Sequence, residues 1–189
     1  DDKRVYLSWG CSPVEPIYIV SVDPHQGFRL LSEPYPVIAG NQSFHGWESA
    51  KFNPLQSAQS AAVLMLTGDR PFIEGSWINK VNGRYYHQYA TPGTELKAYG
   101  DGVYVSSISP LGPYARDSHN PVSHKPSGFI AGAGHGSTFR DLHGQWWHIC
   151  TGLISIRHNF ERRVVLFPAY FDPERFPASF RAPGDPGDA

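Results

Sequence analysis

The sequence predicts an all-β protein, and three observations support this class. Gly (19) and Pro (17) together make up nearly one residue in five of the 189, a density that long helices tolerate poorly. Aromatic residues account for 14% of the chain. Short runs rich in Val, Ile, Tyr and Trp recur between turn residues, as β-strands do. The clearest runs are RVYLSW, IYIVSV, RYYHQYA, GVYVSS, QWWHICT and RVVLF.

These runs form a repeat. A turn residue, a basic or amide residue and an aromatic strand follow one another three times, in KRVYLSWG, NGRYYHQYA and HGQWWHICTG. Each copy predicts the second arm of a hairpin. The segments after the first two copies, 17–37 and 103–122, also resemble each other. The repeating unit is a four-stranded antiparallel meander, which is typical of a β-propeller blade; ordinary hairpins of a β-sandwich are the alternative.

The repeat also predicts the domain organisation. Three copies amount to about three blades, whereas closed propellers typically have at least four. We therefore expect residues 1–171 to form a partial propeller whose first hairpin begins upstream of Asp1. An Asn-Pro start and apolar residues at helical spacing predict a short helix near 54–66, in an insertion. Residues 172–189, rich in Pro, Gly and Ala, predict a tail.

Charge and apolar patterning exclude several partners. Lys plus Arg (16) do not exceed Asp plus Glu (17), so a nucleic-acid partner is not expected. No apolar run approaches the roughly 20 residues of a membrane span, and the start DDKRVYL does not resemble a signal peptide. Cys11 and Cys150 lack the spacing of a zinc site or a disulfide framework, and we expect both to be buried thiols.

The first chemical motif is FIEGSW, in which Glu74 opens a predicted strand and is followed by Gly75. The glycine allows another group to approach closely, and the innermost strand of a propeller blade lines the central channel. Apolar neighbours Ile73 and Trp77 would favour the protonated form that a general acid needs. Spacing alone, however, fits a solvated turn glutamate better.

The second motif is GAGHGS, residues 132–137. Glycines on both sides leave the imidazole of His135 accessible, which suits a metal-bound water or a sugar hydroxyl. A tight turn between blades is the alternative. Other histidines show no ligand spacing and are expected at the surface or in loops; examples are His25, His45, His119, His124 and His158.

Five tryptophans offer flat faces that match the C–H face of a sugar ring. Most of them are expected in the core. One or two, Trp77 among them, would form sugar platforms.

These segments resemble glycoside hydrolase family 43, five-bladed propeller enzymes that hydrolyse arabinose- and xylose-containing polysaccharides. The resemblance rests on IEGSWINKVNGRYYHQYA and AGHGSTFRDLHGQWWHI, with DDKRVYLSWG as a weaker match. It implies an arabinofuranosidase- or xylosidase-like glycosidase that inverts configuration. Glu74 would be its general acid, and His135 would lie at the channel, where it contacts substrate or, through water, a structural calcium ion. No cofactor is implied as a requirement.

The resemblance leaves other roles open. Either Arg157 or Arg163 matches an arginine that family members direct toward the substrate. The aspartate base and the aspartate that tunes the acid have no match in this sequence and would precede Asp1. We therefore expect the 189 residues alone to be inactive, and the intact protein to be a glycosidase acting outside the cytoplasm.

Two other functions fit the same pattern. A propeller that binds carbohydrate without catalysis would keep the pocket and lack the base. A protein-interaction propeller would place Glu74 on its outer rim. A shared channel for Glu74 and His135 would favour the two sugar-directed functions, whose partner is an oligosaccharide or polysaccharide.

Overall fold

The computed structural model describes residues 4–49, 70–154, 161–171 and 180–181, and these residues are folded almost entirely as β-strands. The elements in chain order are β1 (Val5–Trp9), β2 (Ile17–Asp23), η1 (Pro24–Gln26), β3 (Arg29–Leu30), β4 (Tyr35–Ile38), η2 (Gly46–Glu48), β5 (Glu74–Val81), β6 (Arg84–Thr91), β7 (Gly100–Ser106), β8 (Ala115–Arg116), β9 (Ser123–His124), β10 (Ala131–Arg140), β11 (Trp146–Leu153), β12 (Arg163–Phe171) and β13 (Phe180–Arg181). Within these ranges, no helix has the length and hydropathy that crossing a membrane requires.

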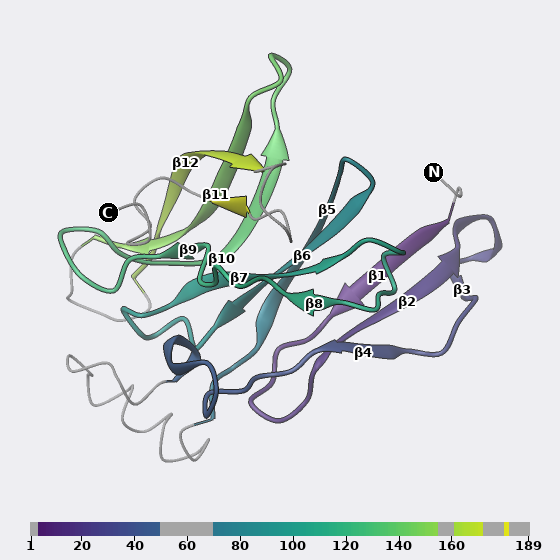
Figure 1. Ribbon diagram of the computed structural model, residues 1–189, viewed down its shortest axis with the longest axis horizontal. Coiled ribbons are helices and arrows are strands. Elements are labelled where there is room, and N and C mark those ends of the chain that lie inside the picture. The colour runs from purple at the N-terminus through teal and green to yellow at the C-terminus, as the bar shows by residue number, and fades with distance from the viewer. Residues whose placement is uncertain (1–3, 50–69, 155–160, 172–179, 182–189) are drawn as a thin grey trace.

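The strands form three antiparallel sheets that follow one another through the molecule in chain order (Figure 1). The first sheet runs β1-β2-β3, with β4 also paired to β2. The second runs β5-β6-β7-β8, with β9 also paired to β7, and the third runs β10-β11-β12-β13. Three consecutive meanders that do not close into a ring confirm the prediction of a partial propeller with about three blades.

The hairpin turns explain why the repeat was visible in the sequence. Between β5 and β6, Val81 pairs with Arg84 across a two-residue turn. Asn82 and Gly83 both have positive φ values, 50° and 78°, as a type I′ turn requires. Asn-Gly is the preferred sequence for this turn because both residues tolerate that conformation. The turn therefore fixes the register of the strands that carry the second copy of the repeat.

In the part of the chain that the structure describes, the first sheet has no counterpart of β5 or β10. By its place in the repeat, β1 corresponds to β6 and β11, each of which has an inner neighbour, β5 or β10. Among the described residues, β1 pairs only with β2. This matches the expectation that the first hairpin begins with its second arm.

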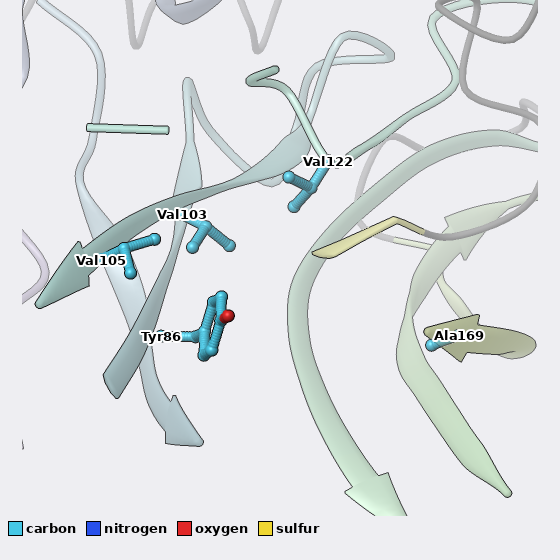
Figure 2. Close-up of a cluster of buried hydrophobic side chains, with 5 residues drawn as sticks. All are labelled: Tyr86, Val103, Val105, Val122 and Ala169. Atoms are coloured by element: carbon cyan, nitrogen blue, oxygen red, sulfur yellow. The ribbon is translucent and has the colours of Figure 1, made fainter. Parts of the chain in front are cut away.

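The core lies between the sheets. One cluster consists of Ile17, Ile38, Ile73 and Tyr89 and joins the first sheet to the second. The other consists of Tyr86, Val103, Val105, Val122 and Ala169; Figure 2 shows Ala169, on β12, facing the side chains of the second sheet. Burying each large apolar side chain stabilises the fold by roughly 1.5–3 kcal/mol, so the contacts between blades hold the sheets together.

All six of the clearest predicted runs are strands: β1, β2, β6, β7, β11 and β12. The GAGHGS segment is not the tight turn that was the alternative expectation for it, because residues 132–137 belong to β10 itself. Register shifts between Gly132 and Gly134 and between Gly134 and Ser137 make this part of β10 a bulged strand. The helix expected near 54–66 lies outside the described residues, as does most of 172–189, where β13 pairs with β12.

Candidate active site

Glu74 is the first residue of β5, so its side chain stands at the entrance of the strand. Just before it, Ile73 and Ser12 exchange two backbone hydrogen bonds, 3.1 and 3.3 Å long, which tie this entrance to the loop after β1. Gly75 has a φ of +67°, and a Cβ there would lie 3.3 Å from the Cα of His135. Glycine at position 75 therefore allows β10 to approach the acid closely.

The carboxyl group of Glu74 is held by two side-chain donors. The hydroxyl of Tyr99 donates to Oε1 at 2.5 Å, and the thiol of Cys11 donates to Oε2 at 3.0 Å. Burial raises the pKa of Tyr99 far above its ordinary value, and the charge of Glu74 and the hydrogen bond to it act in the same direction. Tyr99 therefore keeps its proton and remains a donor to Glu74.

The prediction that both cysteines are buried holds for Cys150 and is wrong for Cys11, which is exposed. Cys11 lies in the loop after β1 instead of on the inner face of a strand. Partial burial raises its pKa to about 11, and the hydrogen bond to Glu74 and the charge of that carboxylate contribute. The thiol is therefore protonated at neutral pH and serves as a hydrogen-bond donor.

His135 lies beside Glu74. Its Nδ1 is 4.0 Å from Oε1 of the carboxyl, and 56% of its side chain is exposed, against 14% for Glu74. Its φ of 55° is a left-handed conformation that is uncommon outside glycine and is one of the irregularities of bulged β10. The bulge thus turns the imidazole outward into the same space that the carboxyl of Glu74 faces.

The two glycines beside His135 are required by what lies under them. A Cβ at Gly134 would come within 2.5 Å of the ring of Tyr99. A Cβ at Gly136 would come within 2.2 Å of the ring of His148 and 2.4 Å of the carboxylate of Asp101. The two glycines therefore allow β10 to pack directly against Tyr99, His148 and Asp101. This close packing is the reason why the sequence has glycine on both sides of His135.

Asp101 and His148 form a buried pair beneath β10, which the sequence did not indicate. His148 Nε2 lies 3.0 Å from Asp101 Oδ2, and the same oxygen accepts the backbone N–H of Gly136 at 3.1 Å. Both side chains are almost fully buried. Asp101 thereby fixes the backbone one residue after His135.

An arginine contacts the site, but it is neither of the two expected. Arg163 is exposed and pairs with Glu161 at 2.6 Å, and Arg157 lies outside the described residues. Arg162 instead lies over the ring of Tyr99, 5.1 Å from its centroid, and donates weakly to Thr151 at 3.4 Å. Neighbouring arginines in an extended segment point to opposite sides, and spacing alone did not indicate which one points inward.

Glu95 is a second carboxyl, and the charge of Glu74 acts on it. Burial raises its pKa, and the negative charge of Glu74 raises it further. The positive charge of Arg162 lowers it. Burial in turn lowers the pKa of Arg162, while the charges of Tyr99, Glu95 and Glu74 oppose that shift. Glu95 and Arg162 are thus electrostatic neighbours of Glu74.

Trp77 occupies a different place. Its indole N–H donates to the backbone carbonyl of Thr138 at 2.9 Å, which joins β5 to β10. Its side chain lines a cavity of about 370 Å³ between β1 and β5, and neither Glu74 nor His135 lines that cavity. The structure therefore brings Glu74 and His135 together, and it anchors Trp77 three residues farther along β5.

Among the residues that the structure describes, no group of three or more His, Cys, Asp and Glu side chains is arranged to hold a metal ion. Calcium requires six to eight oxygen ligands. The carboxyl of Glu74 already accepts from Tyr99 and Cys11. A calcium ion reached through His135 stays a prediction.

Similarity to known proteins agrees with this geometry. A xylosidase/arabinosidase of Bacteroides ovatus is 41% identical over 46 residues, which are 24% of this chain and 13% of that protein. The structure of an endo-1,4-β-xylanase from Bacteroides thetaiotaomicron matches with a TM-score of 0.70 and 21% identity, covering 97% of this chain and 55% of that one. A xylan β-1,4-xylosidase from Bacillus halodurans matches with a TM-score of 0.69 and 18% identity, covering 98% and 32%.

The structural matches concern the fold, and the chain spans about a third to a half of those two proteins. The family profile described as glycosyl hydrolases family 43 matches residues 2–177. Because that match covers nearly the whole chain and includes both Glu74 and His135, the protein belongs to glycosyl hydrolases family 43.

Proposed function

We propose that this chain is the part of an inverting glycosidase that supplies the general acid, Glu74. The observation that carries the proposal is the position of Glu74, whose carboxyl lies 4.0 Å from the exposed imidazole of His135 at the entrance of β5.

The chemistry requires a carboxyl group that protonates the oxygen of the departing sugar or alcohol. Glu74 is mostly buried but retains an exposed part, which is the compromise that such a group needs. Burial limits competition from bulk water, and the exposed part admits the glycosidic oxygen.

We assign substrate binding to His135 and Arg162. His135 presents a polar ring to the open side of the site. Among the described residues, no group accepts a hydrogen bond from Nε or Nη2 of Arg162. Buried donors of this kind favour a ligand that brings its own oxygens, as a sugar hydroxyl does.

An inverting enzyme also needs a carboxylate base roughly 6.5–9.5 Å from the acid, with room for water between them. We propose that a part of the protein beyond these 189 residues supplies this base. The sugar-directed names of the relatives, xylosidase/arabinosidase and xylan β-1,4-xylosidase, support xylose- and arabinose-containing glycosides as the substrate class.

The test is to assay the protein expressed from its complete reading frame on aryl xylosides and aryl arabinofuranosides. Glu74→Gln keeps the shape of the side chain and removes its proton. We expect kcat/KM to fall by about 10²–10⁴-fold, the usual contribution of a general acid. Glu33→Gln, at an exposed glutamate, is the matched control and should leave kcat/KM unchanged.

Full activity of Glu74→Gln would refute the role of Glu74. Saturable binding of xylo-oligosaccharides by the complete protein, with no turnover, would instead establish a carbohydrate-binding propeller. The 189-residue chain assayed alone should show no turnover.

A further inference from the structure

The two oxygens of the Glu74 carboxyl have different hydrogen-bond donors. Oε1 accepts from the hydroxyl of Tyr99 at 2.5 Å, and Oε2 accepts from the thiol of Cys11 at 3.0 Å. Tyr99 is fully enclosed, whereas Cys11 is exposed. Oε1 therefore has a buried donor, although the exposed imidazole of His135 also lies 4.0 Å from it, and Oε2 has an exposed donor.

Tyr99 determines which oxygen carries the acidic proton. Its hydroxyl is buried and keeps its proton, and a buried O–H that loses its acceptor is costly. Glu74 is the acceptor that the structure gives it among the described residues. Oε1 therefore stays an acceptor in both protonation states of Glu74, and the proton that is gained and lost belongs on Oε2.

Cys11 is suited to the partner role at Oε2 in both states. A thiol is a weak donor and a weak acceptor, so S–H donates to Oε2 of the carboxylate, and Sγ accepts from Oε2–H of the acid. A stronger, donor-only partner such as lysine would stabilise the carboxylate alone and oppose protonation. A weak hydrogen bond from the thiol of Cys11 therefore permits Oε2 to be protonated and deprotonated.

The backbone holds Cys11 in this position. Its neighbour Ser12 exchanges two hydrogen bonds with Ile73, the residue before Glu74. The hydroxyl of Ser12 also accepts the backbone N–H groups of Val14 and Glu15, at 3.1 and 2.9 Å, which orders the turn that follows. Cys11 and Glu74 are therefore adjacent on two paired segments.

We propose that Cys11 is a positioning residue for the acid and that Oε2, the oxygen facing Cys11, delivers the proton. The inference rests on the proposed role of Glu74. In the step, the proton on Oε2 moves to the glycosidic oxygen, the bond between that oxygen and the anomeric carbon breaks, and the leaving group departs as an alcohol. Water adds to the anomeric carbon and gives its proton to the general base. Oε2, now anionic, accepts the S–H of Cys11.

The experiment compares two leaving groups in the complete protein. A 2,4-dinitrophenyl glycoside departs without protonation, whereas a methyl glycoside of the same sugar requires the acid. Cys11→Val removes the hydrogen bond at similar volume, and Cys11→Ser keeps a group that both donates and accepts. We expect Cys11→Val to lower kcat/KM about tenfold on the methyl glycoside and less than about twofold on the dinitrophenyl glycoside. Cys11→Ser should recover most of the loss.

Equal losses of Cys11→Val on both substrates, or no loss on either, would overturn the inference. Glu74→Gln measured in parallel separates the two proposals. If Glu74→Gln discriminates between the leaving groups and Cys11→Val does not, only the role of Cys11 fails. If neither variant discriminates, the proposed function fails and the inference fails with it.

A second measurement uses the 189-residue chain and needs no activity. The rate of alkylation of Cys11 by iodoacetamide at pH 8 reports its thiolate fraction. Glu74→Gln removes the adjacent charge, and we expect the rate to rise about three- to tenfold. Buried Cys150 is the internal control, because its slow reaction shows that the variant is folded. An unchanged rate at Cys11 would contradict the contact on which the inference rests.

Discussion

Two glutamates of this protein are each bonded by a tyrosine hydroxyl and lie beside a histidine, yet their surroundings differ. Glu48 is completely buried. Its Oε1 accepts the hydroxyl of Tyr89 at 2.7 Å and lies 3.1 Å from Nδ1 of His45, and its Oε2 accepts the backbone N–H of Asn41 at 2.7 Å. Every partner of Glu48 is fixed, and no side of the carboxyl is open.

Glu74 has a tyrosine too, but its other donor is a weak, exposed thiol, and its histidine stands 4.0 Å away in an exposed position. A carboxylate enclosed by strong donors can only support the fold, because a proton has neither a free oxygen to occupy nor a route in. A carboxyl with one weak donor and one open side can gain and lose a proton. The comparison therefore favours a structural role for Glu48 and supports the catalytic role proposed for Glu74.

The largest expected difference between the two sites is in stability. Glu48→Ala leaves the buried hydroxyl of Tyr89 without an acceptor and removes the partner of His45 and of the Asn41 N–H, and we expect the free energy of unfolding to fall by about 3 kcal/mol. Glu74→Ala leaves only the hydroxyl of Tyr99 without its acceptor, and we expect the free energy of unfolding to fall by about 1 kcal/mol. Urea denaturation of both variants measures their free energies of unfolding. Equal losses would contradict the distinction between a structural Glu48 and a catalytic Glu74.

A buried histidine extends the comparison to pH. His87 is fully buried, contacts Ser76 at 2.7 Å, and burial lowers its pKa to about 3. Because its folded-state pKa lies below the ordinary value of about 6.5, the unfolded chain binds the proton first as the pH falls. The stability that neutral His87 contributes is therefore fully present above about pH 6.5, and it is lost as the pH falls toward about 3.

Between pH 7 and pH 5, we expect His87 to account for about 2 kcal/mol of that loss. Thermal melting at a series of pH values measures the slope. His87→Leu cannot take up the proton and should flatten the curve. An identical slope in this variant would assign the acid sensitivity to other groups.

The smallest expected effect comes from the two tyrosines. Tyr89→Phe removes a donor from a carboxyl that keeps its contacts with Asn41 and His45, and it should cost about 1–1.5 kcal/mol of stability. Tyr99→Phe should cost less than about 1 kcal/mol, because Glu74 retains solvent access, but it should lower kcat/KM by allowing the proton to move to Oε1. Reversed results, with activity lost only in Tyr89→Phe, would exchange the roles assigned to the two glutamates.

Local sequence predicted the strands well, for a physical reason. The runs that became β1, β2, β6, β7, β11 and β12 combine strand-forming residues with turn residues at their ends, and both signals act within a few residues. The bulged part of β10 was missed because glycines around His135 read as a turn. Only the packing of Tyr99 and His148 beneath β10 shows that they serve a strand.

At the site, the sequence indicated Glu74 and His135 through their motifs, but it did not indicate their partners. Cys11 is 63 residues from Glu74 in the sequence. Arg162, and not Arg163, contacts the site because its side chain points toward Tyr99. His45 was expected at the surface or in a loop; it does lie in a loop, but it is buried against Glu48. Such contacts depend on how the sheets pack, which no local pattern encodes.

The carbonyl of Thr138 accepts hydrogen bonds from both Trp77 and Asn79, at 2.9 and 2.8 Å, and so fastens β10 to β5 at a single atom. The separation of Glu74 and His135 therefore depends on how the backbones of β5 and β10 are joined, and the loop after β1 supports the same end of β5 through Ser12 and Ile73. A mutation that shifted β10 against β5 would therefore change the distance between these two side chains without replacing either of them.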